Sequence, residues 1–189
     1  MTVVVLVVTG VSLVLAGFAW LPRSGSKAQG VLTAVMVVAL AAVGVLLLFR
    51  ATDTSGWDEQ VRATLILVAG GLAVAGGGPL TTSVLALVDR GNPRSLSTQR
   101  AGEILRGGAL IGALERGAIF GSMVAGWPEG IAITLAIKGL ARYPELSDPD
   151  QIDPDKPDPG AARAVAERFI IGTFTSVLWA VGCAALLLT

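Results

Sequence analysis

Hydrophobic residues fall into six long runs along the chain, and short polar segments separate the runs. They cover residues 3–21, 30–48, 63–88, 107–126, 130–143 and 169–188. Most approach the roughly 20 residues that a helix needs to cross about 30 Å of hydrocarbon. Lipid offers no partner to a free backbone amide, and the alternation typical of a membrane barrel strand is missing, so we expect helices. The pattern predicts an all-α fold, in which residues 1–189 form one polytopic membrane bundle of six transmembrane helices.

The first run resembles a signal peptide in length but not in its flanks. Only Met1 and Thr2 precede it, so a basic segment is missing, and its end reads Trp20-Leu21-Pro22-Arg23 instead of a small-residue cleavage site. We therefore expect it to be retained as a helix. Composition agrees with a bilayer protein, because 53% of the residues are hydrophobic, 15% are charged and the mean hydropathy is +0.71.

Basic residues are distributed unevenly between the polar segments. Eleven of the 14 Lys and Arg residues fall in or beside the first, third and fifth segments. Basic segments stay in the cytoplasm, so these three are predicted to be cytoplasmic and both termini to be outside. Arg outnumbers Lys 11 to 3 in a chain rich in Ala, Gly and Val, which favours a high-GC bacterium and its plasma membrane.

A helix-breaking element interrupts the third run. It consists of Gly76, Gly77, Gly78 and Pro79, and hydroxyl residues follow at 81–83. Three glycines remove side-chain support and the proline removes one amide donor, so we expect a kink or a short unwound turn whose freed carbonyls the hydroxyls satisfy. Broken helices also build binding sites in transporters. A packing kink and a binding site both remain open, and we favour the kink.

Charged residues near the middle of the membrane are the sharpest candidate site. Glu115 and Arg116 lie nine and ten positions beyond Arg106, about 14 Å along a helix. A charge at that depth costs at least about 2.5–3.5 kcal/mol, so each needs a partner inside the bundle. The predicted polar cluster comprises Glu115, Arg116, Lys138, Arg142 and Glu167, with Lys138 as the partner of Glu115. It is either an ion-pair network that fixes helix register or a site for a proton, an ion or a small anion.

Arg116 has a more specific predicted partner. Its guanidinium offers five N–H donors in one plane and needs acceptors at mid-membrane. We expect it to donate to the carbonyls that the break at residues 76–79 frees. The alternative is that it bonds only to Glu167 or to water.

Small residues recur at four-residue intervals in two runs. They are Ala109, Ala113, Gly117, Gly121 and Ala125 in the fourth run, and Gly172, Ser176, Ala180 and Ala184 in the sixth. Such stripes let helix backbones approach closely. We expect packing within the chain in preference to a homodimer seam, which remains the alternative.

Residue types that carry chemistry are scarce. The chain has no His and a single Cys, Cys183, which is expected to be a small buried residue. His-based catalysis, haem ligation and mixed His zinc sites are therefore excluded. Residues 147–160 contain five Asp and four Pro, but their spacing does not fit a calcium loop, so a mobile cytoplasmic segment is predicted. We expect no catalytic activity, no metal or cofactor, and no nucleic-acid partner.

One pattern resembles a known family. Its residues are Gly108, Ile111, Gly112, Leu114, Glu115 and Arg116, then Lys138 and Arg142, then Ala166, Glu167, Ile170, Ile171, Gly172, Thr173 and Ser176. Over about residues 105–180, this pattern resembles a family of uncharacterised bacterial membrane proteins, which also occurs at the C-terminal end of longer proteins with a domain of unknown function. Arg168 departs from it, because many relatives have an aromatic residue there. The resemblance implies a membrane protein and no particular activity.

Taken together, these features favour an integral plasma-membrane protein that is a component of a membrane assembly. Its expected partners are the lipid bilayer and either another membrane protein or further copies of itself. A small transporter or channel for protons, ions or a small anion is the alternative, and a membrane-bound enzyme is the third. A water-filled cavity at Glu115 and Arg116 favours transport, and a dry, paired cluster favours assembly.

Overall fold

The protein is a bundle of helices. The computed structural model describes residues 2–18, 27–50, 59–91, 108–141, 143 and 161–188. Within these ranges the chain forms six helices and no strand, which confirms the all-α prediction. The helices are α1 (Thr2–Phe18), α2 (Lys27–Arg50), α3 (Glu59–Gly91), α5 (Gly108–Val124), α6 (Glu129–Ala141) and α8 (Ala161–Leu188). The Asp- and Pro-rich segment 147–160 lies outside the described residues.

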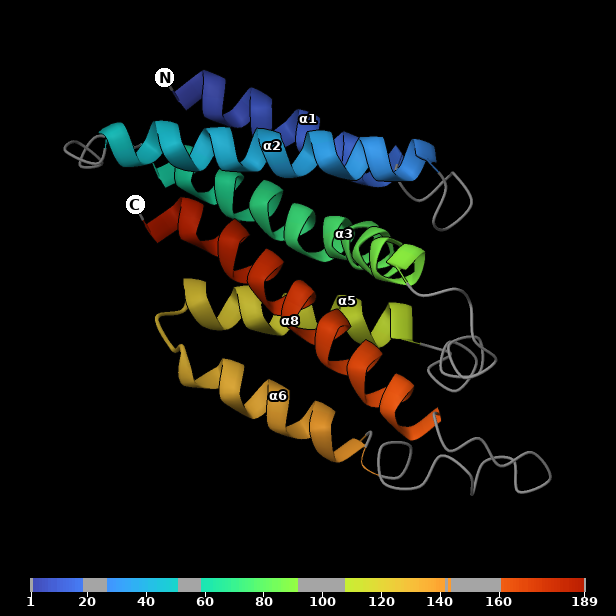
Figure 1. Cartoon of the computed structure of the whole chain (residues 1–189). Helices are drawn as coiled ribbons and strands as arrows, with labels where there is room; N and C mark the ends of the chain where they lie inside the picture. The colour runs from blue at the N-terminus through green and yellow to red at the C-terminus, as the bar shows by residue number, and fades with distance from the viewer. Residues whose placement is uncertain are drawn as a thin grey trace.

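Successive helices run in opposite directions, and α3 lies at the centre (Figure 1). It packs against α1, α2, α5 and α8, whereas α6 lies on the outer side of α5. The start of α1, the end of α8 and the turn between α5 and α6 lie at the same end of the bundle (Figure 1). This arrangement places the predicted charged residues of α5 between the central helix and the outer one.

The turn between α5 and α6 shows how local sequence ends one helix and starts the next. Gly126 has a φ of 71°, which L side chains rarely adopt, and follows the last turn of α5. Its N–H donates to the Met123 carbonyl at 3.1 Å, and the Trp127 N–H donates to the Ser122 carbonyl at 2.8 Å. These bonds form a Schellman cap. Pro128 then precedes α6 with a fixed φ, where no amide donor is needed.

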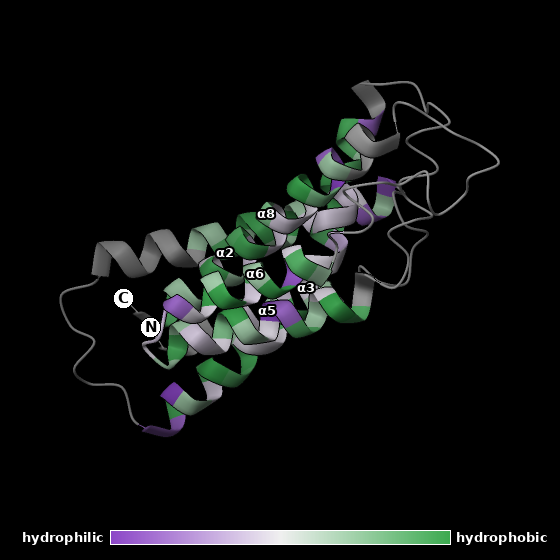
Figure 2. Ribbon diagram, turned by 90° about the horizontal axis from the view of Figure 1, so that it is seen from below, coloured by the Kyte–Doolittle hydropathy of each residue, from purple (hydrophilic) through white to green (hydrophobic). Residues whose placement is uncertain are grey.

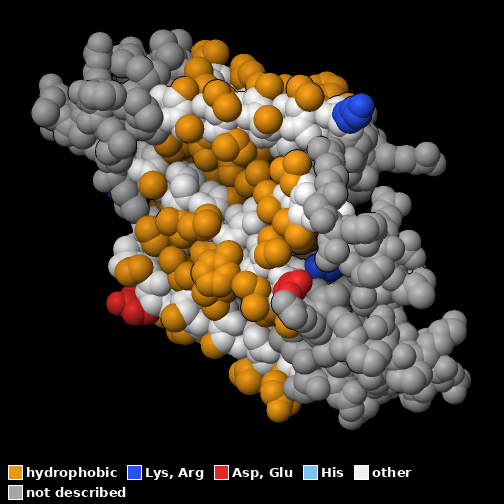
Figure 3. Space-filling model, viewed as in Figure 1, with side chains coloured by type: hydrophobic (Ala, Val, Ile, Leu, Met, Phe, Trp, Pro, Cys, Tyr) orange, Lys and Arg blue, Asp and Glu red, His pale blue; other side chains and the backbone are white. Residues whose placement is uncertain are grey.

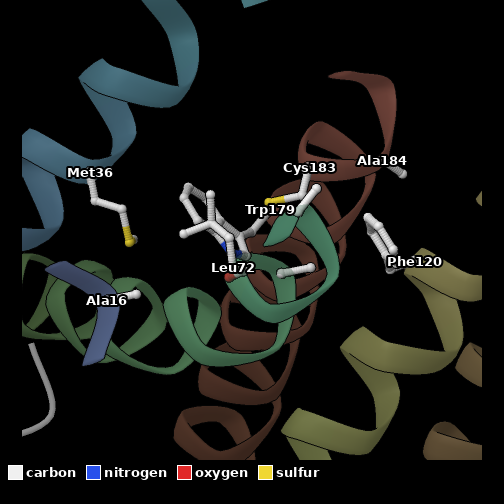
Figure 4. Packing of buried hydrophobic residues seen from close by; sticks show 9 residues of the cluster. Ala16, Met36, Leu72, Phe120, Trp179, Cys183 and Ala184 are labelled. Atoms are coloured by element: carbon white, nitrogen blue, oxygen red, sulfur yellow. The ribbon is translucent and has the colours of Figure 1, made fainter. Parts of the chain in front are cut away.

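Small, polar and some large apolar residues fill the inside of the bundle, and many other large apolar side chains face outward. The main cluster of buried residues contains Ala16, Met36, Ala69, Leu72, Ala73, Phe120, Trp179, Cys183 and Ala184 (Figure 4). Four of these nine are alanines, and Cys183 is buried as predicted. Along the outside, Leu67 is 76% exposed and Leu140 is 75% exposed. Hydrophobic residues occur along the whole length of the helices (Figure 2), and many of them are exposed.

The prediction of six membrane spans is confirmed only in part. The described residues form six helices, but not all of them are long and apolar enough to be recognised as spans. Two segments are long and apolar enough to cross a membrane, Glu59–Asp89 in α3 and Ala166–Leu187 in α8. Val7–Phe18 and Lys27–Ala42 are shorter apolar helices. At 1.5 Å per residue, α5 with its 17 residues and α6 with its 13 residues measure about 25 and 20 Å.

Helix α3 continues through the predicted break. Residues 76–79 remain helical, so the unwound turn expected as one possibility is not found. The helix changes direction instead: its first part runs across the view in Figure 1, and its last part is seen almost end-on. A proline inside a helix removes one hydrogen bond and its ring crowds the preceding turn, which explains a bend without unwinding.

Candidate functional site

Arg116 is buried between α3, α5 and α8. It is 3% exposed. Its Nε and NH2 groups both donate to the Val74 carbonyl, at 3.0 and 2.8 Å, and NH1 donates to the Ser176 hydroxyl at 3.3 Å. The predicted contact of Arg116 with the backbone beside the break is found, but its acceptor is not a carbonyl that the break frees. The acceptor is Val74, whereas Pro79 removes the helical amide partner of Ala75.

The glycines of the break provide room for this contact. A Cβ on Gly77 would overlap the Cδ of Arg116 and lie 2.7 Å from its Nε. A Cβ on Gly76 would lie 2.7 Å from Cζ2 of Trp179 and 2.9 Å from the sulfur of Met36. Real Cβ atoms essentially never approach that closely, so these two positions require glycine. Their role is to let side chains of α5, α8 and α2 pack onto the α3 backbone.

Trp179 is a second donor to the same stretch of α3, and the sequence analysis missed it. Its indole Nε1 donates to the Leu72 carbonyl at 3.1 Å, and its side chain is buried next to Leu72 and Cys183 (Figure 4). Buried tryptophan usually pairs its N–H. A tryptophan within an apolar run was the available signal, but the pattern did not identify its acceptor.

Glu115 and Lys138 form the predicted ion pair between α5 and α6. Lys138 Nζ lies 2.5 Å from Glu115 Oε2, and the two side chains are 18% and 12% exposed respectively. The ammonium group also lies 5.8 Å from the centre of the Phe169 ring on α8. The other carboxylate oxygen, Glu115 Oε1, is buried and has no hydrogen-bond partner. Among the acidic side chains that the structure describes, only Glu115 has a buried oxygen without a hydrogen-bond partner.

The described residues of the predicted cluster contact different helices. Arg116 faces α3 and α8, while Glu115 faces α6, as expected for adjacent residues about 100° apart on a helix. Glu167 is exposed on α8. Arg168, next to it, forms an ion pair with Asp89 of α3 at 2.8 Å, so this side chain links α8 to α3. Arg142 lies outside the described residues.

A polar contact between α2 and α3 was also missed. Gln29 Nε2 donates to the Thr82 hydroxyl at 2.9 Å, and the Thr33 hydroxyl lies 3.0 Å from the Ser83 hydroxyl. Gln29 and Thr33 are 4% and 2% exposed. The hydroxyl of Thr82 also donates to the Pro79 carbonyl at 2.9 Å, within its own helix. The hydroxyls after the break therefore join the two helices as well as capping local carbonyls.

The stripe of small residues on α8 packs within the chain, as expected. Ala180 and Ala184 are fully buried, and a Cβ on Gly172 would lie 3.5 Å from Thr81 of α3. The stripe on α5 is only partly covered: the space next to Gly121 is open, and Gly121 is exposed. The homodimer alternative therefore remains only for α5.

An apolar groove lies between α2, α3 and α8. Its volume is about 530 Å³, and it is visible as a hollow with a hydrophobic floor between α2 and α8 (Figure 3). Neither Glu115 nor Arg116 lines it. Over the described part of the chain, no three His, Cys, Asp or Glu side chains come together as a metal site.

Comparisons with protein-family models, with curated proteins and with solved structures find no match to this chain. The chemistry available to it therefore has to be argued from its own geometry. The site combines a guanidinium enclosed by protein acceptors with a separate carboxylate that is ion-paired through one oxygen and open at the other.

Proposed function

We propose that this chain is an integral membrane protein whose six helices all cross the bilayer. The observation that supports it is the distribution of side chains: alanines, hydroxyls and Arg116 lie inside, while large apolar side chains lie exposed on all six helices. In water this arrangement would leave a large apolar surface uncovered. In lipid the exposed side chains are solvated, and small residues allow close helix packing. A short helix such as α6 is accommodated by local thinning of the bilayer.

The proposed orientation places both termini outside a bacterial plasma membrane. Cysteine labelling tests it in a Cys183→Ala background. Cysteines at Ser24, Ser97 and Gln151 should be shielded from a membrane-impermeant reagent in whole cells, and a cysteine at Ser55 should react. Labelling at Gln151 with protection at Ser55 would reverse the topology. A soluble chain would make all four positions equally reactive in the cytosolic fraction of lysed cells.

We propose that its role is that of a component of a membrane assembly. The supporting observation is that Arg116 donates to the Val74 carbonyl and the Ser176 hydroxyl and does not line the groove. A substrate-binding arginine would instead point its planar fork into an accessible cavity. Used in this way, the charge fixes how α5 and α8 pack on α3.

Site-specific photo-crosslinking in native membranes tests the assembly. A photoreactive residue replaces Leu114, which is 68% exposed on α5, or Leu67, which is 76% exposed on α3. A partner predicts a crosslinked product of one defined mass at one of these faces. Only lipid adducts at both positions, together with migration of the native extract at the size of a single 19.3 kDa chain, would refute the role in an assembly.

A second function is supported by one observation, the open oxygen of Glu115. A buried carboxylate next to Lys138 can accept and release a proton, or exchange partners with the ammonium group. Proton translocation through this pair predicts pH changes in proteoliposomes under an imposed potential. Glu115→Gln should abolish these changes and leave the helix content intact. Equal rates for the wild-type protein, the variant and empty vesicles would eliminate this function.

A further inference from the structure

The groove between α2, α3 and α8 is built to hold hydrocarbon. Among its lining residues only Thr175 has a polar side chain. Leu40 of α2, Leu80 of α3, and Leu178 and Trp179 of α8 are among the residues that line it. The Trp179 N–H is already bonded to the Leu72 carbonyl, so the ring presents only carbon to the groove. A polar ligand would find no fixed donor or acceptor there.

The groove exists because α2 and α8 diverge on the surface of α3 (Figure 1). The contacts of Gln29 with Thr82 and of Thr33 with Ser83 hold α2 to α3 toward one end. The residues that line the groove on α2 begin at Val37, which lies four residues beyond Thr33, or about 6 Å further along at 1.5 Å per residue. Gly182 deepens the groove, because a Cβ there would meet no atom within 4 Å.

We propose that one acyl chain of a membrane lipid occupies this groove. The inference rests on the proposed insertion of the chain into a bilayer. The groove's volume of about 530 Å³ lies within the roughly 300–1,000 Å³ of cavities that hold small, mostly apolar ligands, so the groove has room for a hydrocarbon tail.

A helix of a second protein is the competing occupant, and its size does not suit the groove. A helix with its side chains is about 10–12 Å across and could place only a few side chains inside. Side chains of fixed shape would leave gaps in the groove, and gaps forfeit dispersion contacts. A flexible hydrocarbon tail adapts to the same groove without gaps, and the groove is open sideways to the proposed bilayer.

Quenching of Trp179 fluorescence by phospholipids with brominated acyl chains tests the occupancy. The other three tryptophans, Trp20, Trp57 and Trp127, are replaced by Phe, and the protein is reconstituted in brominated lipid. Trp179 is only 4% exposed, so lipid that surrounds the bundle without entering it reaches the ring poorly. A resident acyl chain predicts loss of most of the Trp179 fluorescence.

Filling the groove provides the decisive variant. Gly182→Leu places a side chain into open space and should restore the Trp179 fluorescence. Gly139→Leu on α6 is the matched control, since a Cβ at Gly139 also meets no atom within 4 Å and Gly139 does not line the groove. The control should leave the quenching unchanged. Unquenched Trp179 in the parent protein, or equal quenching in both variants, would overturn the proposal.

Two further measurements separate the competing explanations. If a second copy fills the groove, quenching is absent at high protein-to-lipid ratio and appears on dilution with lipid, which overturns the acyl-chain assignment. If the protein does not insert at all, a tryptophan placed at the exposed position Leu114 in a Trp179→Phe background is unquenched as well. Quenching at Leu114 without quenching at Trp179 would refute the occupied groove and leave membrane insertion standing.

Discussion

Replacing Gly77 with alanine should destabilise the protein, although the same change in most helices is stabilising. The new Cβ would overlap Cδ of Arg116 and lie 2.7 Å from its Nε. Both atoms are held in place, because Nε and NH2 donate to the Val74 carbonyl at 3.0 and 2.8 Å. The guanidinium must therefore withdraw from its acceptor or the helices must separate.

The magnitude follows from the two opposing effects. Removing the partner of a buried charge typically costs about 3–5 kcal/mol. Alanine gains about 0.5–1 kcal/mol over glycine inside a helix. The free energy of unfolding should therefore fall by about 2–4 kcal/mol for Gly77→Ala. Gly139→Ala adds a Cβ into open space on α6, so it should instead raise the free energy of unfolding by about 0.5–1 kcal/mol.

Reversible unfolding in mixed micelles, followed by circular dichroism during a denaturant titration, measures both variants. The cause is isolated by repeating Gly77→Ala in an Arg116→Met background, where most of its cost should disappear. If Gly77→Ala and Gly139→Ala change stability in the same direction and by the same amount, the proposed close contact between Arg116 and Gly77 is wrong. If the full cost persists without the guanidinium, the contact of the new Cβ with Trp179 at 3.1 Å is responsible instead.

Two more predictions concern contacts between helices. Glu115→Gln and Lys138→Met should each lower the free energy of unfolding by up to about 3–5 kcal/mol, because each leaves a charge unpaired in the bundle. The double variant should recover part of this loss. Strictly additive losses in a double-mutant cycle of thermal unfolding would show that the two residues do not interact. Trp179→Phe removes the N–H that donates to the Leu72 carbonyl. The free energy of unfolding should fall by about 0.5–1.5 kcal/mol for the lost hydrogen bond, and further for the lost packing. An unchanged free energy of unfolding in the denaturant titration would mean that the bond contributes nothing.

Local sequence determined the helices, the environment that suits them, and the need of buried charges for partners. Runs of apolar residues must form helices in lipid, whatever they pack against. The pairing of Glu115 with Lys138 was also predictable, since a short turn at 125–128 joins α5 to α6 and brings the two positions to the same level. Likewise, Arg116 had to find acceptors, and a kinked stretch of backbone was the expected source.

Tertiary structure decided which acceptor each donor reaches. The sequence pattern does not say which neighbour a helix face meets, because the outward-facing and core-facing positions of this chain are both apolar. Thus Val74 as the acceptor of Arg116 and Leu72 as the acceptor of Trp179 follow only from how α5 and α8 pack on α3. The same packing put Glu167 on the surface, gave two glycines a steric role, and left a groove where α2 and α8 diverge.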